Sequence, residues 1–162
     1  MRKLNIFFDV DYTLVMWDGS LRNHTRHVFE RIRELGHDIY IWSGVGIRRW
    51  DMKRHDLDEF VAGYFVKPLW DYKQRLPDFK VDVMPDFVID DHKGVVDDFG
   101  GYHISDIADA DDEELLEVLR LIELAGQQAG RYASSPSSAS TVTLAIIRAI
   151  SSVMTNGSRA IS

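Results

Sequence analysis

Two pairs of acidic residues follow short apolar runs of the sequence. Asp9 and Asp11 come directly after the run Leu4–Phe8, and Asp90 and Asp91 come directly after a second run. Carboxylates that end buried strands are costly unless a cation or a catalytic reaction uses them. A single Asp in such a place is an ordinary turn or helix-cap residue. Two pairs together indicate metal binding, or nucleophilic and acid–base chemistry.

A hydroxyl and an ammonium group follow two further apolar runs. Ser43 and Gly44 come after Ile39–Trp42, and a small hydroxyl followed by glycine lets backbone N–H groups approach an anion. Lys67 comes after Tyr64–Val66 and carries a positive charge. The four groups together have the composition of a site that binds an anion and a cation.

The elements that must position these residues alternate between strand and helix. Five short runs that are rich in β-branched and aromatic residues predict strands, at Leu4–Phe8, Ile39–Trp42, Tyr64–Val66, Phe87–Ile89 and Tyr102–Ile104. Helical spacing or composition predicts helices between and after them, at His24–Leu35, Ile47–His55, Trp70–Leu76 and Asp111–Leu124, the last ending before Gly126. This alternation predicts an α/β fold: a Rossmann-like three-layer sandwich with a mostly parallel five-stranded sheet. The carboxyl ends of the strands would bring the polar residues to one edge of the sheet.

Length and composition exclude several classes of protein. With 162 residues, of which 45% are hydrophobic and 28% charged, the chain is long enough for one globular domain. The absence of Cys excludes disulfide frameworks and zinc–thiolate sites. No apolar run is long enough for a signal-peptide core or a membrane span. We therefore expect a cytoplasmic protein without a membrane partner.

Charge divides the chain near residue 126. All 26 acidic residues lie in 1–126, together with 16 of the 19 basic ones, which gives this part a net charge of −10 within a total of −7. Such a charge argues against nucleic acid as a partner. Residues 127–162 carry only arginine charges; their Ser-rich stretch 134–140 is typical of a linker. Beyond it, Val142, Ile146 and Ile150 have the spacing of a short amphipathic helix. The predicted organisation is a core at 1–126 and a tail at 127–162.

In chain order, the sequence presents FFDVDYTL, IYIWSG, VKP and VIDD, each at the end of a predicted strand. This ordered set resembles the four motifs of the haloacid dehalogenase (HAD) superfamily of phosphohydrolases, and the resemblance extends from residue 4 to about residue 104. It implies a HAD-like core. Neither interval between the first three motifs can hold the roughly 50 residues that an independent cap domain needs. The chain therefore resembles a small, capless member of the family.

The resemblance implies a magnesium-dependent phosphatase that hydrolyses a phosphate monoester through an aspartyl-phosphate intermediate. Asp9 resembles the nucleophile, and Asp11 resembles the group that protonates the leaving oxygen and then activates water. Ser43, Gly44 and Lys67 resemble the phosphate-binding residues. Lys73 is the alternative lysine, although Lys67 is preferred because it directly ends a predicted strand.

Magnesium is the expected metal because the candidate ligands are all hard oxygen atoms. They are the carboxylate of Asp9, the backbone carbonyl of Asp11, and Asp90 or Asp91. Because side chains of adjacent residues diverge, only one of the last two is expected to bind the metal directly, and Asp91 is slightly favoured.

Three functions compete at this stage. The first is the phosphatase, acting on a phosphorylated small molecule or a phosphoprotein, with a homo-oligomer as one way of covering the open site. The second is a phosphotransferase of the same family, and the third is a catalytically silent phosphate-binding regulatory module. Asp11 argues against dehalogenase and ion-pumping members, which resemble the chain at the first Asp but lack the second carboxylate.

Overall fold

The sheet has its N-terminal strand at the centre. The computed structural model describes residues 2–132, and its strands are β1 (Asn5–Phe8), β2 (Asp38–Ser43), β3 (Val61–Val66), β4 (Phe87–Asp90) and β5 (Gly101–His103). Their order is β3-β2-β1-β4-β5, and every neighbouring pair is parallel. The predicted α/β fold with a five-stranded parallel sheet is confirmed.

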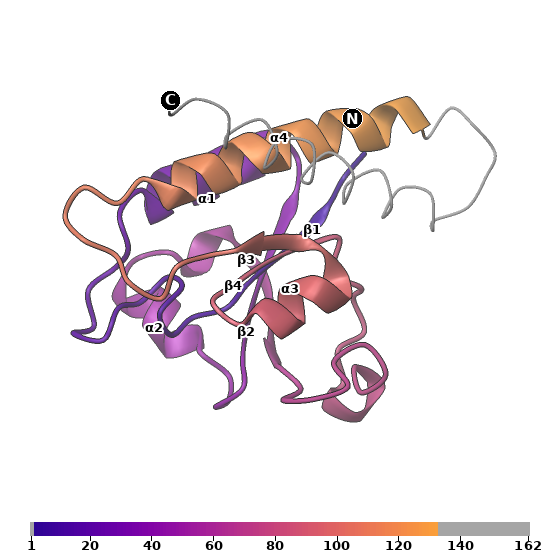
Figure 1. Cartoon of the computed structure of the whole chain (residues 1–162), viewed down its shortest axis with the longest axis horizontal. Helices are drawn as coiled ribbons and strands as arrows, with labels where there is room; N and C mark the ends of the chain where they lie inside the picture. Colours follow the sequence, from indigo (N-terminus) through magenta and orange to yellow (C-terminus); the bar gives the residue numbers. More distant parts are fainter. Residues whose placement is uncertain (1, 133–162) are drawn as a thin grey trace, which may run out of the picture.

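Helices cover both faces of this sheet (Figure 1). The α-helices are α1 (Thr25–Glu34), α2 (Arg49–Arg54), α3 (Lys93–Phe99) and α4 (Glu114–Tyr132), with short 3₁₀ turns at η1 (Asp58–Phe60) and η2 (Pro77–Phe79). Figure 1 shows α4 running along α1 on one side of the sheet and α3 on the other. The arrangement is a three-layer sandwich, as the strand–helix alternation predicts.

Alternation along the central strand divides the core into two parts. Ile6 and Phe8 of β1 pack into the larger cluster, with α1 and α4, whereas Phe7 points to the opposite face. There its ring lies 4.9 Å from that of Trp42, whose ring in turn lies 5.6 Å from that of Phe99 in α3. Both faces of β1 are therefore buried from Ile6 to Phe8, which is why these three residues are all apolar.

The strand order changes direction beside β1. From β1 the chain crosses to β2 and β3 on one side, and then to β4 and β5 on the other. In open parallel sheets, ligands bind outside the carboxyl ends of the strands at such a switch point. Here the switch lies between β1 and β4, where the Asp9 amide donates to the carbonyl of Ile89 at 3.0 Å.

Two predicted helices differ from those observed. Trp70–Leu76 forms a series of turns instead of a helix, because Asp71 takes a left-handed φ of 47° and Pro77 has no N–H to continue a helix. The predicted end of the last helix at Gly126 is also wrong. That helix is α4, which continues to Tyr132 and buries Ala129 against the larger core, so packing outweighs the low helix propensity of glycine.

Some predictions for the C-terminal part fall beyond Tyr132. The expected amphipathic stretch with Val142, Ile146 and Ile150 lies outside the described residues. Within residues 2–132, no helix combines the length and the apolar character that crossing a bilayer requires.

A buried histidine makes the fold sensitive to acid. The Leu4 amide donates to His37 Nδ1 at 3.2 Å, so the neutral ring carries its proton on Nε2, a buried atom without a hydrogen-bond partner. Burial lowers the pKa of His37, although Asp86 and Asp38 partly oppose the shift. The unfolded chain therefore binds the extra proton more readily, and His37 removes stability as the pH falls through its unfolded pKa of about 6.5.

His37→Gln should remove this acid-dependent loss, because the amide oxygen can still accept from Leu4 but cannot titrate. Between about pH 7.5 and about pH 5.5, the wild type should lose about 1 kcal/mol more unfolding free energy than the variant. Urea unfolding at the two pH values measures the difference. His27→Gln, at an exposed position of α1, is the control and should keep the wild-type dependence of the unfolding free energy on pH. The same dependence on pH in all three proteins would contradict the role given to His37.

Gly101 allows β5 to pair with β4. It has a φ of 145°, and an added Cβ would lie 1.9 Å from the carbonyl oxygen of Val88, its partner in β4. Gly101→Ala should therefore cost at least about 2 kcal/mol of unfolding free energy. Gly94→Ala in α3 is the matched control, since its Cβ would meet Tyr72 at an ordinary 3.6 Å. Thermal melts that show similar stability for both variants would contradict the close approach.

Candidate active site

A lysine lies between two buried carboxylates at the switch point. Lys67 follows β3, and its Nζ donates to Oδ1 of Asp9 at 2.9 Å and to Oδ2 of Asp90 at 2.7 Å. The exposed fractions are 5% for Asp9, 7% for Lys67 and 0% for Asp90. The ends of β1, β3 and β4 thus join in one buried ionic cluster, which we call the Asp–Lys–Asp triad.

Asp9 is held on both of its carboxylate oxygens. Its Oδ1 accepts from Lys67, and its Oδ2 accepts from the Thr13 hydroxyl at 3.2 Å. Thr13 is completely buried, and its amide bonds to the Val10 carbonyl in the tight turn that follows Asp9. The Asp9 carboxylate is therefore oriented before any ligand arrives, as a nucleophile or a metal ligand must be.

Burial governs the electrostatics of the triad. Desolvation, followed by the negative charge of Asp90, raises the pKa of Asp9, although Lys67 opposes this shift. Desolvation likewise raises the pKa of Asp90, again against Lys67. Burial lowers the pKa of Lys67, but the two carboxylates outweigh it and the net shift is upward. The carboxylates at the site thus carry more negative charge than the one lysine neutralises.

Asp11 lies at the rim and is paired with an arginine. Its side chain is 44% exposed, and its Oδ2 accepts a short hydrogen bond from Nη1 of Arg48. Asp51 in α2 fixes the rest of the guanidinium, accepting from Nε at 2.7 Å and from Nη2 at 3.2 Å. The backbone of Tyr12 next to Asp11 has a left-handed φ of 61°, which turns the chain away from the strand direction.

Ser43 and Gly44 form the turn that leaves β2, beside the triad. The Ser43 hydroxyl accepts from the Val45 amide at 3.3 Å, and its carbonyl accepts from the Lys67 amide at 3.0 Å. Leu69 lies so close over Gly44 that a Cβ there would be 2.5 Å from its Cδ2. The turn after β2 and the residues after β3 are thus locked together, and this fixes the backbone from which Lys67 extends.

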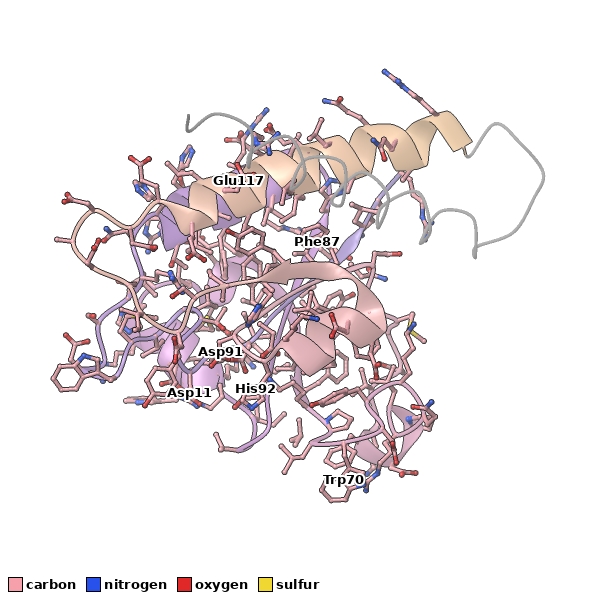
Figure 2. The ribbon with its side chains drawn as sticks, in the orientation of Figure 1. Asp11, Trp70, Phe87, Asp91, His92 and Glu117 are labelled. Carbon is pink, nitrogen blue, oxygen red and sulfur yellow. The ribbon has the colours of Figure 1, made fainter. Side chains whose placement is uncertain are left out.

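The second acidic pair splits into a buried and an accessible member. Asp90 uses Oδ2 for Lys67 and Oδ1 for the His92 amide at 2.9 Å. Asp91 is partly exposed, and ligand atoms of Asp90, Asp91 and His92 lie within 4.8 Å of one another. Figure 2 shows Asp91 and His92 at the same end of the molecule as Asp11.

This donor set fits a hard divalent cation. With Asp9, Asp90 and Asp91 ionised, Lys67 leaves two negative charges in the cluster, and carboxylate oxygens are ligands that Mg²⁺ prefers. Because the oxygens of Asp90 are already engaged, Asp91 is the member of the pair with the more accessible oxygens. The residues that would hold the ion are Asp9, the carbonyl of Asp11, and Asp91 or Asp90.

The geometry distinguishes the two candidate lysines. Lys67 contacts Asp9, whereas Nζ of Lys73 lies 5.6 Å from the ring centre of Phe99, in the layer of α3. Lys73 is therefore part of the packing on that face and does not reach the triad.

Arg22 is a site residue that sequence reasoning missed. It is 2% exposed, and its Nη1 donates to the carbonyls of Tyr12 at 3.3 Å, Thr13 at 3.4 Å and Ser105 at 2.9 Å. Asp112 accepts from its Nε at 2.8 Å and neutralises it. The loop that carries Asp11 is thereby fastened to the loop after β5. No periodicity marks this role, since Arg22 lies in an irregular segment far from Asp112 in the sequence. Sequence reasoning also missed His92, which lies beside Asp90 and Asp91.

Comparison of the chain with protein-family models, with curated proteins and with solved structures gives no match.

Lys67→Met should destabilise the fold, because it leaves Asp9 and Asp90 buried without their shared cation. Breaking a buried pair in this way costs about 3–5 kcal/mol. Urea unfolding in EDTA measures the loss, and the double variant Lys67→Met/Asp90→Asn should recover part of it by removing one carboxylate. Lys73→Met is the control and should lose much less. Equal losses for the two single variants would show that the triad does not stabilise the fold.

Proposed function

We propose that this protein is a magnesium-dependent phosphatase that hydrolyses phosphate monoesters through an aspartyl-phosphate intermediate. The observation that carries the proposal is the Asp–Lys–Asp triad at the switch point, with a second carboxylate, Asp11, two residues after Asp9. A buried, preoriented carboxylate beside a lysine suits attack on phosphorus better than it suits a structural role. The resemblance of the four motifs to the HAD superfamily agrees with this assignment.

In the first half of the reaction, an oxygen of Asp9 attacks the phosphorus atom. The bond from phosphorus to the ester oxygen breaks, its electron pair stays on the leaving oxygen, and Asp11 gives that oxygen a proton. Lys67 and the turn at Ser43 and Gly44 would bind the phosphoryl oxygens, on which negative charge is spread in the transition state. The products are the free alcohol and phosphorylated Asp9.

In the second half, water attacks the same phosphorus atom. Asp11, now ionised, takes a proton from this water, the bond from phosphorus to Asp9 breaks, and inorganic phosphate leaves. Arg48 holds Oδ2 of Asp11, so Oδ1 is the oxygen that would transfer the proton in both halves. Thr13 keeps Asp9 in one orientation throughout.

A divalent cation held by Asp9, the Asp11 carbonyl and Asp91 or Asp90 would offset the repulsion between the anionic nucleophile and the anionic phosphate. The excess negative charge of the cluster supports this requirement. Within residues 2–132, the interval between Asp9 and β2 contains only a short loop and α1, and that between β2 and β3 contains only α2 and η1. Bulky as well as small esters could therefore approach the site.

The test is hydrolysis of para-nitrophenyl phosphate by the full chain. Activity should disappear in EDTA and return with Mg²⁺, and Asp9→Asn should lower kcat by at least about a thousandfold. Asp11→Asn should slow the second half more than the first with this activated leaving group, so that mass spectrometry detects phosphate on the peptide that contains Asp9. Asp97→Asn, which removes an exposed acid paired with Lys93, is the control and should stay active.

Robust turnover in EDTA would overturn the metal requirement. Equal and modest losses in Asp9→Asn and Asp11→Asn would overturn the roles given to these residues. Binding of phosphate without any turnover would instead favour a regulatory module.

A further inference from the structure

Exposed apolar side chains gather at the edge of the sheet that carries the candidate site. Within residues 2–132, nine large apolar side chains are exposed, and all except Met84 follow the end of a strand by nine residues or fewer: Tyr12, Trp17, Val45, Ile47, Trp50, Leu69, Trp70 and Ile107. Figure 2 shows Trp70 at the same side of the molecule as Asp11 and His92. Exposed apolar patches of this kind mark binding surfaces.

Part of this surface is hollowed into a pocket. It has a volume of about 350 Å³ and lies between the loop 12–20 and the loop 106–108. Its apolar lining includes Tyr12, Met16, Trp17 and Ile107, of which Trp17 is 85% and Ile107 is 77% exposed. The volume is at the small end of the range of about 300–1,000 Å³ for ligand sites, enough for a single ring rather than an extended ligand.

The walls of the pocket are preformed. In the first loop, the Met16 amide donates to the Ser20 carbonyl at 2.9 Å, and Asp18 accepts from both the amide and the hydroxyl of Ser20. Arg22 then joins the two walls, since its Nη1 bonds to the carbonyl of Tyr12 on one side and to that of Ser105 on the other. A ligand would therefore meet a shape that needs little rearrangement.

The pocket lies beside residues that adjoin the candidate site. Tyr12 lines it and is the neighbour of Asp11, the residue that would protonate the leaving oxygen. A second hollow, lined by Asp91 and Asp106 among others, meets the pocket at Asp106, which lines both. The pocket and the second hollow thus share a wall residue, and the second hollow includes Asp91 of the candidate site.

The charges of the pocket select among leaving groups. Asp18 and Asp106 line it, whereas none of the described residues that line it is Lys, Arg or His. An apolar group gains by covering Trp17 and Ile107, and a negatively charged group would face the two carboxylates of the lining. Nucleoside diphosphates, nucleoside triphosphates and sugar bisphosphates, whose leaving groups carry further phosphates, do not suit such a lining.

We propose that this pocket binds the leaving group of the substrate and that the substrate is a phosphate monoester of an apolar, ring-containing alcohol without negative charge. The assignment rests on the proposed phosphatase function and names the substrate class for it. Trp17 and Ile107 supply the apolar contact, and Asp18 and Asp106 exclude anionic leaving groups.

The test compares aryl phosphates with acetyl phosphate, whose small leaving group does not fill the pocket. With the full chain and Mg²⁺, Trp17→Ala should lower the ratio of kcat/KM for phenyl phosphate to that for acetyl phosphate about tenfold, mainly through KM for the aryl ester. Trp50→Ala removes an equally large exposed ring outside the pocket and should leave the ratio at its wild-type value. An unchanged ratio in Trp17→Ala, or an equal fall in Trp50→Ala, would overturn the assignment.

A second pair of substrates tests whether the pocket excludes negatively charged leaving groups. para-Carboxyphenyl phosphate should be hydrolysed with a kcat/KM on the order of tenfold lower than that of the neutral para-carbamoylphenyl phosphate, and Asp106→Asn should narrow this gap. A higher kcat/KM for para-carboxyphenyl phosphate than for the neutral ester would overturn the exclusion of anions. A difference in kcat/KM that Asp106→Asn does not change would overturn it as well. If the wild type hydrolyses neither the aryl phosphates nor acetyl phosphate, the phosphatase proposal itself fails, and the leaving-group assignment fails with it. Hydrolysis of phenyl phosphate with a kcat/KM that Trp17→Ala does not change overturns the substrate class alone.

Discussion

The salt bridges of Lys67 to Asp9 and Asp90 constrain much of the rest of this structure. Burying three ionisable groups is costly, and the attraction among them compensates only when the geometry is good. That geometry requires β1, β3 and β4 to end at one level, although β2 lies between β1 and β3. The hydrogen bond from the Lys67 amide to the Ser43 carbonyl provides this alignment by tying the end of β3 to the end of β2. The same contacts therefore fix both the register of the sheet and the geometry of the site.

A second buried ion pair supports the loops instead of the strands. Arg22 with Asp112 fixes the loop after β1 to the loop after β5, and it does so mainly through backbone carbonyls. Side chains on these loops can therefore change while their backbones stay in place. The groups proposed to react and the groups proposed to contact the rest of the substrate are positioned by different ion pairs, one at strand ends and one between loops.

Much of the framework could be predicted from the sequence because it depends on local signals. Runs such as Ile39–Trp42 and Phe87–Ile89 are short, apolar and bounded by polar residues, and these features locate strands and hence strand ends. Asp9, Ser43, Lys67 and Asp90 follow from those ends, and the structure brings all four to the same edge of the sheet.

What the sequence could not reveal depends on contacts between distant segments. Arg22 meets Asp112 only because the chain has crossed the sheet several times between them, and Arg48 reaches Asp11 from a different loop. Lys73 lies in the turns at 70–76, where a helix was predicted. The sequence alone therefore could not establish that Lys67, and not Lys73, contacts Asp9. α4 continues past Gly126 because Ala129 is buried against the core. The helix propensity of the segment does not indicate this contact.

The central place of the first strand has a consequence for how the chain folds. β1 pairs with β2 after a single crossover, but its other neighbour is β4, with Ile6 opposite Phe87. Closing so long a loop is entropically slow compared with forming the β1–β2–β3 half, so that half can assemble first, with one edge of β1 still open. In this order Asp9 and Lys67 meet before Asp90 arrives. Docking of β4 then completes the Asp–Lys–Asp triad and covers the open edge of β1 in the same event. A chain that is still prone to aggregate at that edge therefore lacks the complete triad.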